Sequence, residues 1–105
     1  NVNINSVKIN DPSLVVLGDN VVVGGGATLN GHLVEGGKIV LEKIVVGNNA
    51  TVGGATMVGP GARIGENSIL GNRALLAKRK VIPDGEVWVG IPARPISSSY
   101  SKSSK

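Results

Sequence analysis

Cut into sixes from Val46, residues 46–93 read VGNNAT VGGATM VGPGAR IGENSI LGNRAL LAKRKV IPDGEV WVGIPA. Seven of the eight units open with a large aliphatic residue, and the last opens with Trp88. Gly follows the aliphatic residue in the first five units, and their fifth residue is always small. The units LGDNVV and VGGGAT repeat this pattern upstream from Leu17 and Val23, and Leu29 opens a third. A period this short predicts a stack of small repeated layers.

The spacing suits a short strand, a sharp bend and another short strand. Three units close a triangular coil, and successive coils stack with parallel strands about 4.8 Å apart. Gly after the aliphatic residue fits a corner that needs either a positive φ or a close backbone approach. Within the repeat Gly recurs about every six residues and leaves no uninterrupted stretch of about 10–12 residues with helical spacing, and the turn spacing does not fit a sandwich. We therefore expect an all-β, single-stranded parallel β-helix of about five coils.

The composition agrees with such a core. The 105 residues include 16 Gly, no Cys, no Phe, and one each of His, Trp and Tyr. Narrow, uniform layers need no large rings, and the lack of Cys excludes disulfides and Cys-ligated metals. No apolar run reaches the ~18 residues of a membrane span, and no signal peptide is visible, so we expect a cytoplasmic protein. The first residue is Asn rather than Met, which predicts an excised piece of something longer.

The charge does not favour a nucleic-acid partner. The net charge is +4, but the Ser/Lys-rich segment 97–105 holds two Lys and no acid, which leaves +2 for the rest. Lys78, Arg79 and Lys80 form the only basic cluster, and Trp88 is the only aromatic residue before residue 97. A nucleic-acid surface normally combines a broader basic face with several stacking rings.

The repeat loses its phase once. Units counted from Leu29 would begin at 35 and 41, whereas the downstream phase requires 34, 40 and 46. Residues 30–38, NGHLVEGGK, cover the break and contain the only His, so we expect an irregular loop there. Insertions in repeat proteins commonly lie on the binding face. We expect the β-helix domain to span 1–96 and residues 97–105 to be a disordered tail.

These features resemble the hexapeptide-repeat acyltransferases, such as the maltose, galactoside and serine acetyltransferases. The resemblance runs from about Asp11 to Ile96 and rests on the hexads, the His-bearing NGHL segment and the closing GIPARP. It implies a left-handed helix, coenzyme A or acetyl-CoA as acyl donor, a small-molecule acceptor and a homotrimer with its sites in clefts between subunits. The segment HLVEGG also looks like the β-helix module that ends some proteins similar to non-ribosomal peptide synthetases.

His32 is the candidate general base. Acyl transfer needs a group that removes a proton from the acceptor, and His ionises near neutrality. The resemblance gives this role to the His of a TGHP-type loop, which reads NGHL here with Leu33 in place of Pro. Glu35 could orient the imidazole, in the manner of a triad's third group. Alternatively, both residues are simply solvated loop side chains.

The resemblance also places the donor and the acceptor. Lys78 or Arg79, or else Lys80, would approach the phosphates of coenzyme A, with Arg94 near the 3′-phosphate, because Lys and Arg suit phosphate groups. The alternative for these cations is a solvated basic edge. The pantetheine arm would lie along Gly54, Asn72 and Ala77. Alternatively, the geometry of the coils alone accounts for these three residues. The acceptor would lie near Asn3, Asn5 and Asp11. Alternatively, these side chains form polar ladders inside the helix.

The sequence thus predicts a coenzyme-A-dependent acyltransferase, most simply an O-acetyltransferase. With no Cys nucleophile, the acceptor would attack the thioester directly. The alternatives are a non-catalytic trimerising module at the end of a larger synthetase, or a scaffold trimmed from such a helix. No metal is expected, because the related γ-class carbonic anhydrases need three His ligands and this chain has one, although three copies of His32 around a symmetry axis could supply them.

Overall fold

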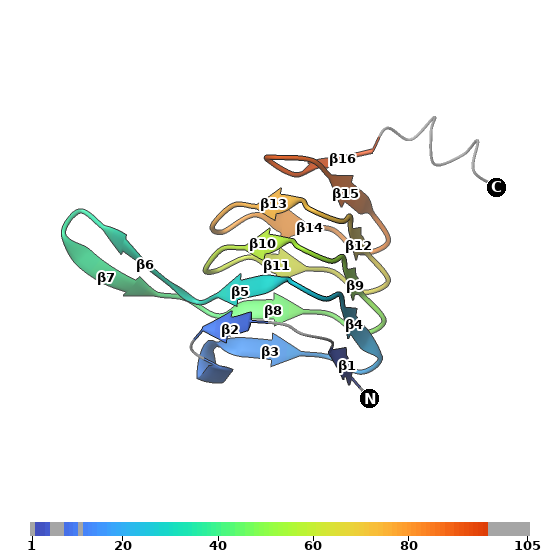
Figure 1. The fold of residues 1–105 in the computed structure, drawn as a ribbon, viewed down its shortest axis with the longest axis horizontal. Coiled ribbons are helices and arrows are strands. Elements are labelled where there is room, and N and C mark those ends of the chain that lie inside the picture. Colours follow the sequence, from blue (N-terminus) through green and yellow to red (C-terminus); the bar gives the residue numbers. More distant parts are fainter. Residues whose placement is uncertain (1, 5–7, 11, 97–105) are drawn as a thin grey trace.

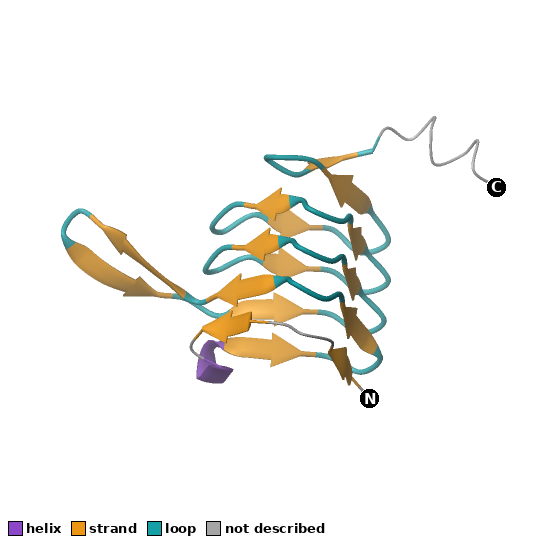
Figure 2. Cartoon of the chain, viewed as in Figure 1, coloured by secondary structure: helices purple, strands orange, loops and turns teal. Residues whose placement is uncertain are grey.

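The computed structural model describes residues 2–4, 8–10 and 12–96. The described residues are almost all strands and turns, and the single helical turn among them is the 3₁₀ segment η1 (Pro12–Leu14) (Figures 1 and 2). The chain winds round three faces in turn, so that strands on one face come from successive coils. The observed architecture is therefore the predicted parallel β-helix.

Each face is one sheet. The first contains β1 (Val2–Ile4), β4 (Val21–Val23), β9 (Thr51–Val52), β12 (Ile69–Leu70), β15 (Val87–Val89) and β16 (Arg94–Pro95). The second contains β2 (Lys8–Asn10), β5 (Thr28–Asn30), β10 (Met57–Val58) and β13 (Leu75–Leu76). The third contains β3 (Val15–Leu17), β8 (Ile44–Val46), β11 (Arg63–Ile64) and β14 (Val81–Ile82). Within these three sheets every pair is parallel except β15 with β16.

The register confirms an 18-residue coil. Met57 pairs with Leu75, Arg63 with Val81, and Ile69 with Val87. Each residue therefore lies above its equivalent three hexads earlier, and the aliphatic residues form ladders inside the helix.

The ladders fill the core as the hexads predict. The first residue of each unit from Val23 to Ile82 has at most 2 % of its surface exposed. The small fifth residues are equally buried: Ala50, Thr56, Ala62, Ser68 and Ala74. The two hydroxyls among them donate to backbone carbonyls, Thr56 to Gly53 at 3.0 Å and Ser68 to Gly65 at 2.5 Å. Alternating large and small inward residues thus pack this narrow prism without a buried ring, and Trp88 lies only at its end, partly buried.

The glycines at the second position of the hexad are needed because the backbone of the next coil approaches them closely, and not because they adopt a positive φ. A Cβ on Gly53 would lie 2.6 Å from the backbone nitrogen of Asn72, and one on Gly65 would lie 2.6 Å from that of Asp84. Both neighbours belong to the next coil, so the second position of the hexad must lack a side chain wherever a coil follows. Ala77 and Pro83 occupy this position in the last full coil, and no further coil covers their corners among the described residues.

The left-handed backbone conformation occurs at the fourth position of the hexad, two residues after the corner Gly. Six residues other than Gly adopt it, with φ between 57° and 62°: Asn20, Asn49, Ala55, Asn67, Arg73 and Arg79. Asn tolerates this conformation better than other residues with a Cβ, which accounts for half of the set.

The segment expected to be an irregular loop is instead a β-hairpin. Strands β6 (His32–Glu35) and β7 (Lys38–Leu41) pair antiparallel and project from the body (Figure 1). Gly36 and Gly37 form the two-residue turn with φ of 58° and 76°. Two positive φ values are what a type I′ turn requires, and Gly-Gly is one of its preferred sequences.

The hairpin explains the phase break. The corner between Leu29 and Ile44 holds fourteen residues (30–43), whereas the equivalent corner between Val58 and Ala62 holds three (59–61). The eleven extra residues are one short of two hexads, so the downstream repeat restarts one position early.

The described chain ends by folding over the second sheet. The amide of Leu75 donates to the carbonyl of Gly90 at 3.0 Å, and that of Ala93 donates to the carbonyl of Leu75 at 2.7 Å. Ala93 is thereby buried. The predicted disordered tail, 97–105, lies outside the described residues.

Candidate active site

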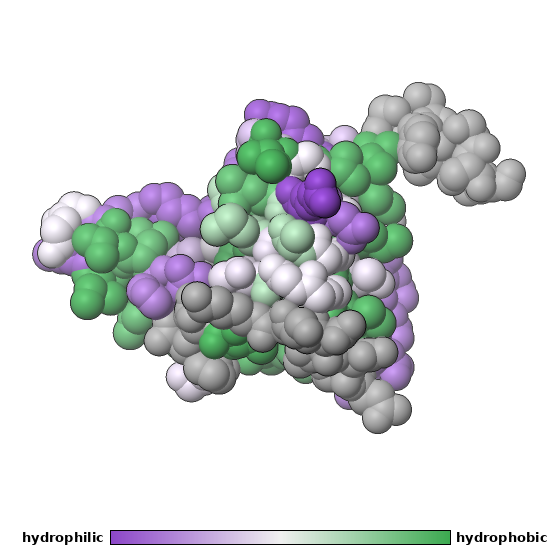
Figure 3. Space-filling view, viewed as in Figure 1, coloured by the Kyte–Doolittle hydropathy of each residue, from purple (hydrophilic) through white to green (hydrophobic). Residues whose placement is uncertain are grey.

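His32 begins the first strand of the hairpin. It pairs with Leu41 across the hairpin, and its backbone N–H donates to Oδ1 of Asn30 at 3.2 Å. Because side chains alternate along a strand, His32 shares its face with Val34, Ile39 and Leu41. These three aliphatic side chains are 60–71 % exposed, whereas His32 is half-buried near the root of the hairpin. Figure 3 shows apolar surface along this arm.

Glu35 lies on the opposite face and contacts the body. Its Oε2 accepts a hydrogen bond from Nζ of Lys78, and its Oε1 accepts one from Nη2 of Arg79 at 3.4 Å. The expectation that Glu35 orients His32 does not match this geometry, because residues three apart on a strand point to opposite faces. Glu35 instead ties the hairpin to the corner of the last full coil.

A second carboxylate completes this cluster. Oε1 of Glu42 lies 2.7 Å from Nε of Arg79. Gly61 lies beneath the pair, and a Cβ there would come within 3.1 Å of Arg79 Cγ and 3.2 Å of Glu42 Oε1. Sequence reasoning missed Glu42, although its place at the end of the insertion, two residues before the repeat resumes at Ile44, was a usable signal.

The charges in this cluster stabilise one another. The hydrogen bond from Lys78 lowers the pKa of Glu35, with Arg79 adding to the effect. The hydrogen bond to Glu35 and the charge of Glu42 raise the pKa of Arg79. All four side chains are 33–46 % exposed, so solvent screens these interactions. Two of the predicted phosphate-binding cations, Lys78 and Arg79, are thus already paired with carboxylates of the same chain, while Lys80 is exposed.

The predicted pantetheine-binding residues divide between two corners. The amide of Gly54 donates to Oδ1 of Asn72 at 2.8 Å. Ala77 lies at the other end of β13, next to Lys78. The outer face of the second sheet joins the two corners and carries Met57, which is 57 % exposed. Arg94 is exposed on β16, opposite Val89.

The side chain of Asn72 also has a structural role. Asn48 and Asp84 make the same contact at other corners, where their Oδ1 atoms accept from the amides of Asp19 and Glu66, each at 2.8 Å. A carboxamide or carboxylate at this position therefore links a corner to the coil before it.

The predicted acceptor residues lie in the N-terminal part of the chain, which the structure describes only in part. Asn5 and Asp11 lie outside the described residues, and for Asn3 the structure describes only the backbone, within β1.

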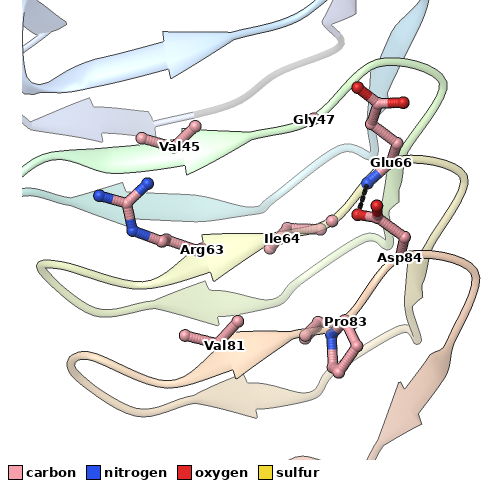
Figure 4. Close-up of a pocket in the computed structure, with 10 residues that line it drawn as sticks. Val45, Gly47, Arg63, Ile64, Glu66, Val81, Pro83 and Asp84 are labelled. Atoms are coloured by element: carbon pink, nitrogen blue, oxygen red, sulfur yellow. Dashed lines mark hydrogen bonds between the residues drawn. The ribbon is translucent and has the colours of Figure 1, made fainter.

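A shallow hollow of about 280 Å³ lies elsewhere, on the third sheet (Figure 4). Arg63 crosses it between Val45 and Val81, and Glu66 and Asp84 border the adjoining corner. None of the predicted site residues lines it. It holds no cluster of groups that matches acyl-transfer chemistry, so we place the candidate site at the hairpin.

Two further features are absent from the described part of the chain. No three His, Cys, Asp or Glu side chains come together where they could hold a metal ion. No helix there has the length and apolar character needed to cross a membrane.

Comparison with known proteins now adds to this geometry. A family model described as bacterial transferase hexapeptide (six repeats) matches residues 43–78. A galactoside acetyltransferase solved in complex with coenzyme A superposes with a TM-score of 0.77 and 31 % identity, over 91 % of this chain and 53 % of that one. The chain is thus a hexapeptide-repeat protein whose repeat at residues 43–78 matches the bacterial transferase model. This confirms the predicted superfamily and, with it, the left-handed β-helix.

Other hexapeptide-repeat structures share the fold. A maltose O-acetyltransferase from Clostridium difficile 630 has a TM-score of 0.76 and 19 % identity, over 92 % of this chain and 66 % of that one. A serine acetyltransferase from Brucella abortus strain S19, in complex with coenzyme A, has a TM-score of 0.75 and 20 % identity. The match covers 91 % of this chain and 37 % of the serine acetyltransferase chain. The chain spans about half the length of the galactoside acetyltransferase. No curated protein sequence matches it significantly.

Proposed function

We propose that this hexapeptide-repeat protein is a coenzyme-A-dependent acyltransferase that carries out O-acetyl transfer to a small-molecule acceptor. The observation that carries the proposal is the His-bearing hairpin inserted into a β-helix that resembles a galactoside acetyltransferase crystallised with coenzyme A. The insertion is the main irregularity between otherwise regular coils, and function concentrates in such segments.

In this proposal His32 is the general base. Its imidazole removes the proton from the acceptor hydroxyl as the oxygen attacks the thioester carbonyl. Backbone amides of the coil stabilise the negative charge that forms on the thioester carbonyl oxygen. The C–S bond then breaks, and the coenzyme A thiolate takes up the proton held by the His32 imidazolium. The chain contains no Cys, which is consistent with direct attack rather than a thioester-linked enzyme intermediate.

The acyl donor would be held by cations at the top of the helix. Lys78 and Arg79 are about half exposed and lie at one corner, and Arg94 is exposed on the last strand. Their chemistry fits phosphate groups, since guanidinium and ammonium groups both bind phosphate oxygens. The outer face of the second sheet would carry the pantetheine arm between Ala77 and the Gly54–Asn72 corner.

We further propose that the protein is a homotrimer. Apolar side chains are exposed on the hairpin and on sheet faces, including Val34 and Ile39 at 71 % and Met57 at 57 %. A closed ring of subunits would cover such surfaces and would bring the hairpin of one subunit to the coil of the next.

Thioester consumption tests the proposal. Wild type, His32→Asn and Lys38→Ala are incubated with acetyl-CoA and a panel of sugars, other alcohols and amines. We expect turnover with at least one acceptor, a loss of roughly 10²–10⁴-fold in His32→Asn, and little change in Lys38→Ala, which alters an exposed hairpin residue. An active His32→Asn variant would contradict the role of His32.

The non-catalytic module stays the second candidate. The observation that favours it is the pairing of Lys78 and Arg79 with Glu35 and Glu42, which occupies the cations that a phosphate would need. It predicts an intact trimer that neither binds coenzyme A nor consumes acetyl-CoA.

A further inference from the structure

The hairpin is attached to the body at two levels. At its root, the amide of Glu42 donates to the carbonyl of Gly31 at 3.0 Å, and the amide of Gly61 donates to the carbonyl of Glu42 at 3.3 Å. Nearer its tip, Glu35 contacts Lys78 and Arg79, which lie 43 and 44 residues further along the chain. The second attachment is purely ionic and half exposed, so another anion can compete for it.

Arg79 is the cation for which an added anion would compete most directly with the two carboxylates. Its Nε faces Glu42 at 2.7 Å, and its Nη2 donates to Glu35 at 3.4 Å. These are the donors that a phosphate group would use, because a guanidinium binds carboxylate and phosphate through the same fork. Its backbone is held in the left-handed region, with φ of 61°, at the corner directly after β13.

We propose that Glu35 and Glu42 compete with the phosphate groups of the acyl donor for Lys78 and Arg79, so that phosphate binding at these two cations releases the tip of the hairpin. The identity of the polyanion rests on the proposed function, whereas the competition rests on the contacts themselves. The root stays attached by its backbone hydrogen bonds. His32 lies at that root on the opposite face from Glu35, so release of the tip changes how the hairpin presents the face that carries His32.

Affinity measurements test the competition. Coenzyme A is titrated calorimetrically, at one fixed ionic strength, into wild type, Glu35→Gln, Glu42→Gln and Glu66→Gln. The last variant removes one exposed negative charge away from the cluster and controls for net charge. We expect Glu35→Gln and Glu42→Gln each to bind about two- to fivefold more tightly than Glu66→Gln, as the strength of exposed ion pairs implies. Equal or weaker binding would overturn the proposal.

Hydrogen exchange separates this proposal from the proposed function. A short hairpin without docking contacts is only marginally stable, so release of its tip should speed amide exchange in residues 32–41. We expect pyrophosphate to speed exchange in wild type, and Glu35→Gln to exchange quickly with or without pyrophosphate. If coenzyme A does not bind but pyrophosphate still speeds exchange, the proposed function fails and the competition stands. If exchange in wild type does not respond to pyrophosphate, the competition fails.

Discussion

At the scale of single residues, each hexad places two separate requirements on its backbone, one steric and one conformational. The second position lacks room for a Cβ, as at Gly53, while the fourth is left-handed, as at Ala55. Sequence reasoning left open which demand the recurrent Gly meets. The distance to the next coil answers the question, and that distance belongs to the stacked structure rather than to any single repeat.

The two positions should respond oppositely to substitution. In Gly53→Ala the new Cβ would lie 2.6 Å from backbone and side-chain atoms of Asn72, so we expect a loss of about 1–3 kcal/mol in unfolding free energy. In Ala55→Gly, where φ is 57°, relief of left-handed strain should leave stability unchanged or raise it by up to about 1 kcal/mol. Urea unfolding measures both, and a fully stable Gly53→Ala would refute this account of the corner.

The ion pairs of Glu35 with Lys78 and Arg79 should weaken at acidic pH. Lys78 and Arg79 face its carboxylate from the coil, and Lys38 lies opposite it in the hairpin. Lys78 and Arg79 hold its pKa below the ordinary value of 4.5, because they favour the ionised form. A lowered folded-state pKa means that the stabilisation is complete above 4.5 and is lost as the pH falls through the lowered pKa.

An NMR titration of the Glu35 side-chain carboxyl carbon measures this effect. We expect a midpoint below 4.5 in wild type and a higher one in Lys78→Ala, which removes the first cause of the shift. A midpoint that Lys78→Ala does not move would contradict the tie.

At the scale of elements, the hexads predicted the strands and corners because every unit repeats the same local rule. The hairpin could also have been predicted, since Val34-Glu35-Gly36-Gly37-Lys38 carries a type I′ turn signal inside the phase break. The partners of Glu35 could not be predicted, because Lys78 lies 43 residues further along the chain and the stacking of two coils decides which corner the hairpin meets. The insertion that carries the candidate site was thus located from sequence, but its ionic contacts were not.

Because the hairpin is an insertion, the β-helix should fold without it. We expect replacement of residues 30–43 by Gly-Pro-Gly, the corner at 59–61, to keep cooperative unfolding and the circular dichroism of parallel strands. The same variant should lose acetyl transfer, because it lacks His32. Loss of folded structure would show instead that the hairpin is needed for the coils to stack.

At the scale of the whole molecule, the described faces leave aliphatic side chains exposed on the hairpin and around the body, including Val34, Ile39 and Ile91 at 71–72 %. The sequence suggested a trimer only through resemblance, because surface complementarity between copies is not encoded in a repeat. We expect light scattering to give about three times the chain mass of 10.7 kDa. A monomeric mass at micromolar concentration would remove the intersubunit cleft from the proposed site.

The proposed role of His32 is that of the general base in acetyl transfer from acetyl-CoA. Its most direct test is the rate of acetyl transfer by His32→Ala with and without added imidazole, at constant acetyl-CoA and acceptor. We expect a rate reduced by roughly 10²–10⁴-fold that rises with imidazole concentration, because the added base replaces the missing side chain. A His32→Ala variant with the wild-type rate, unresponsive to imidazole, would contradict this role.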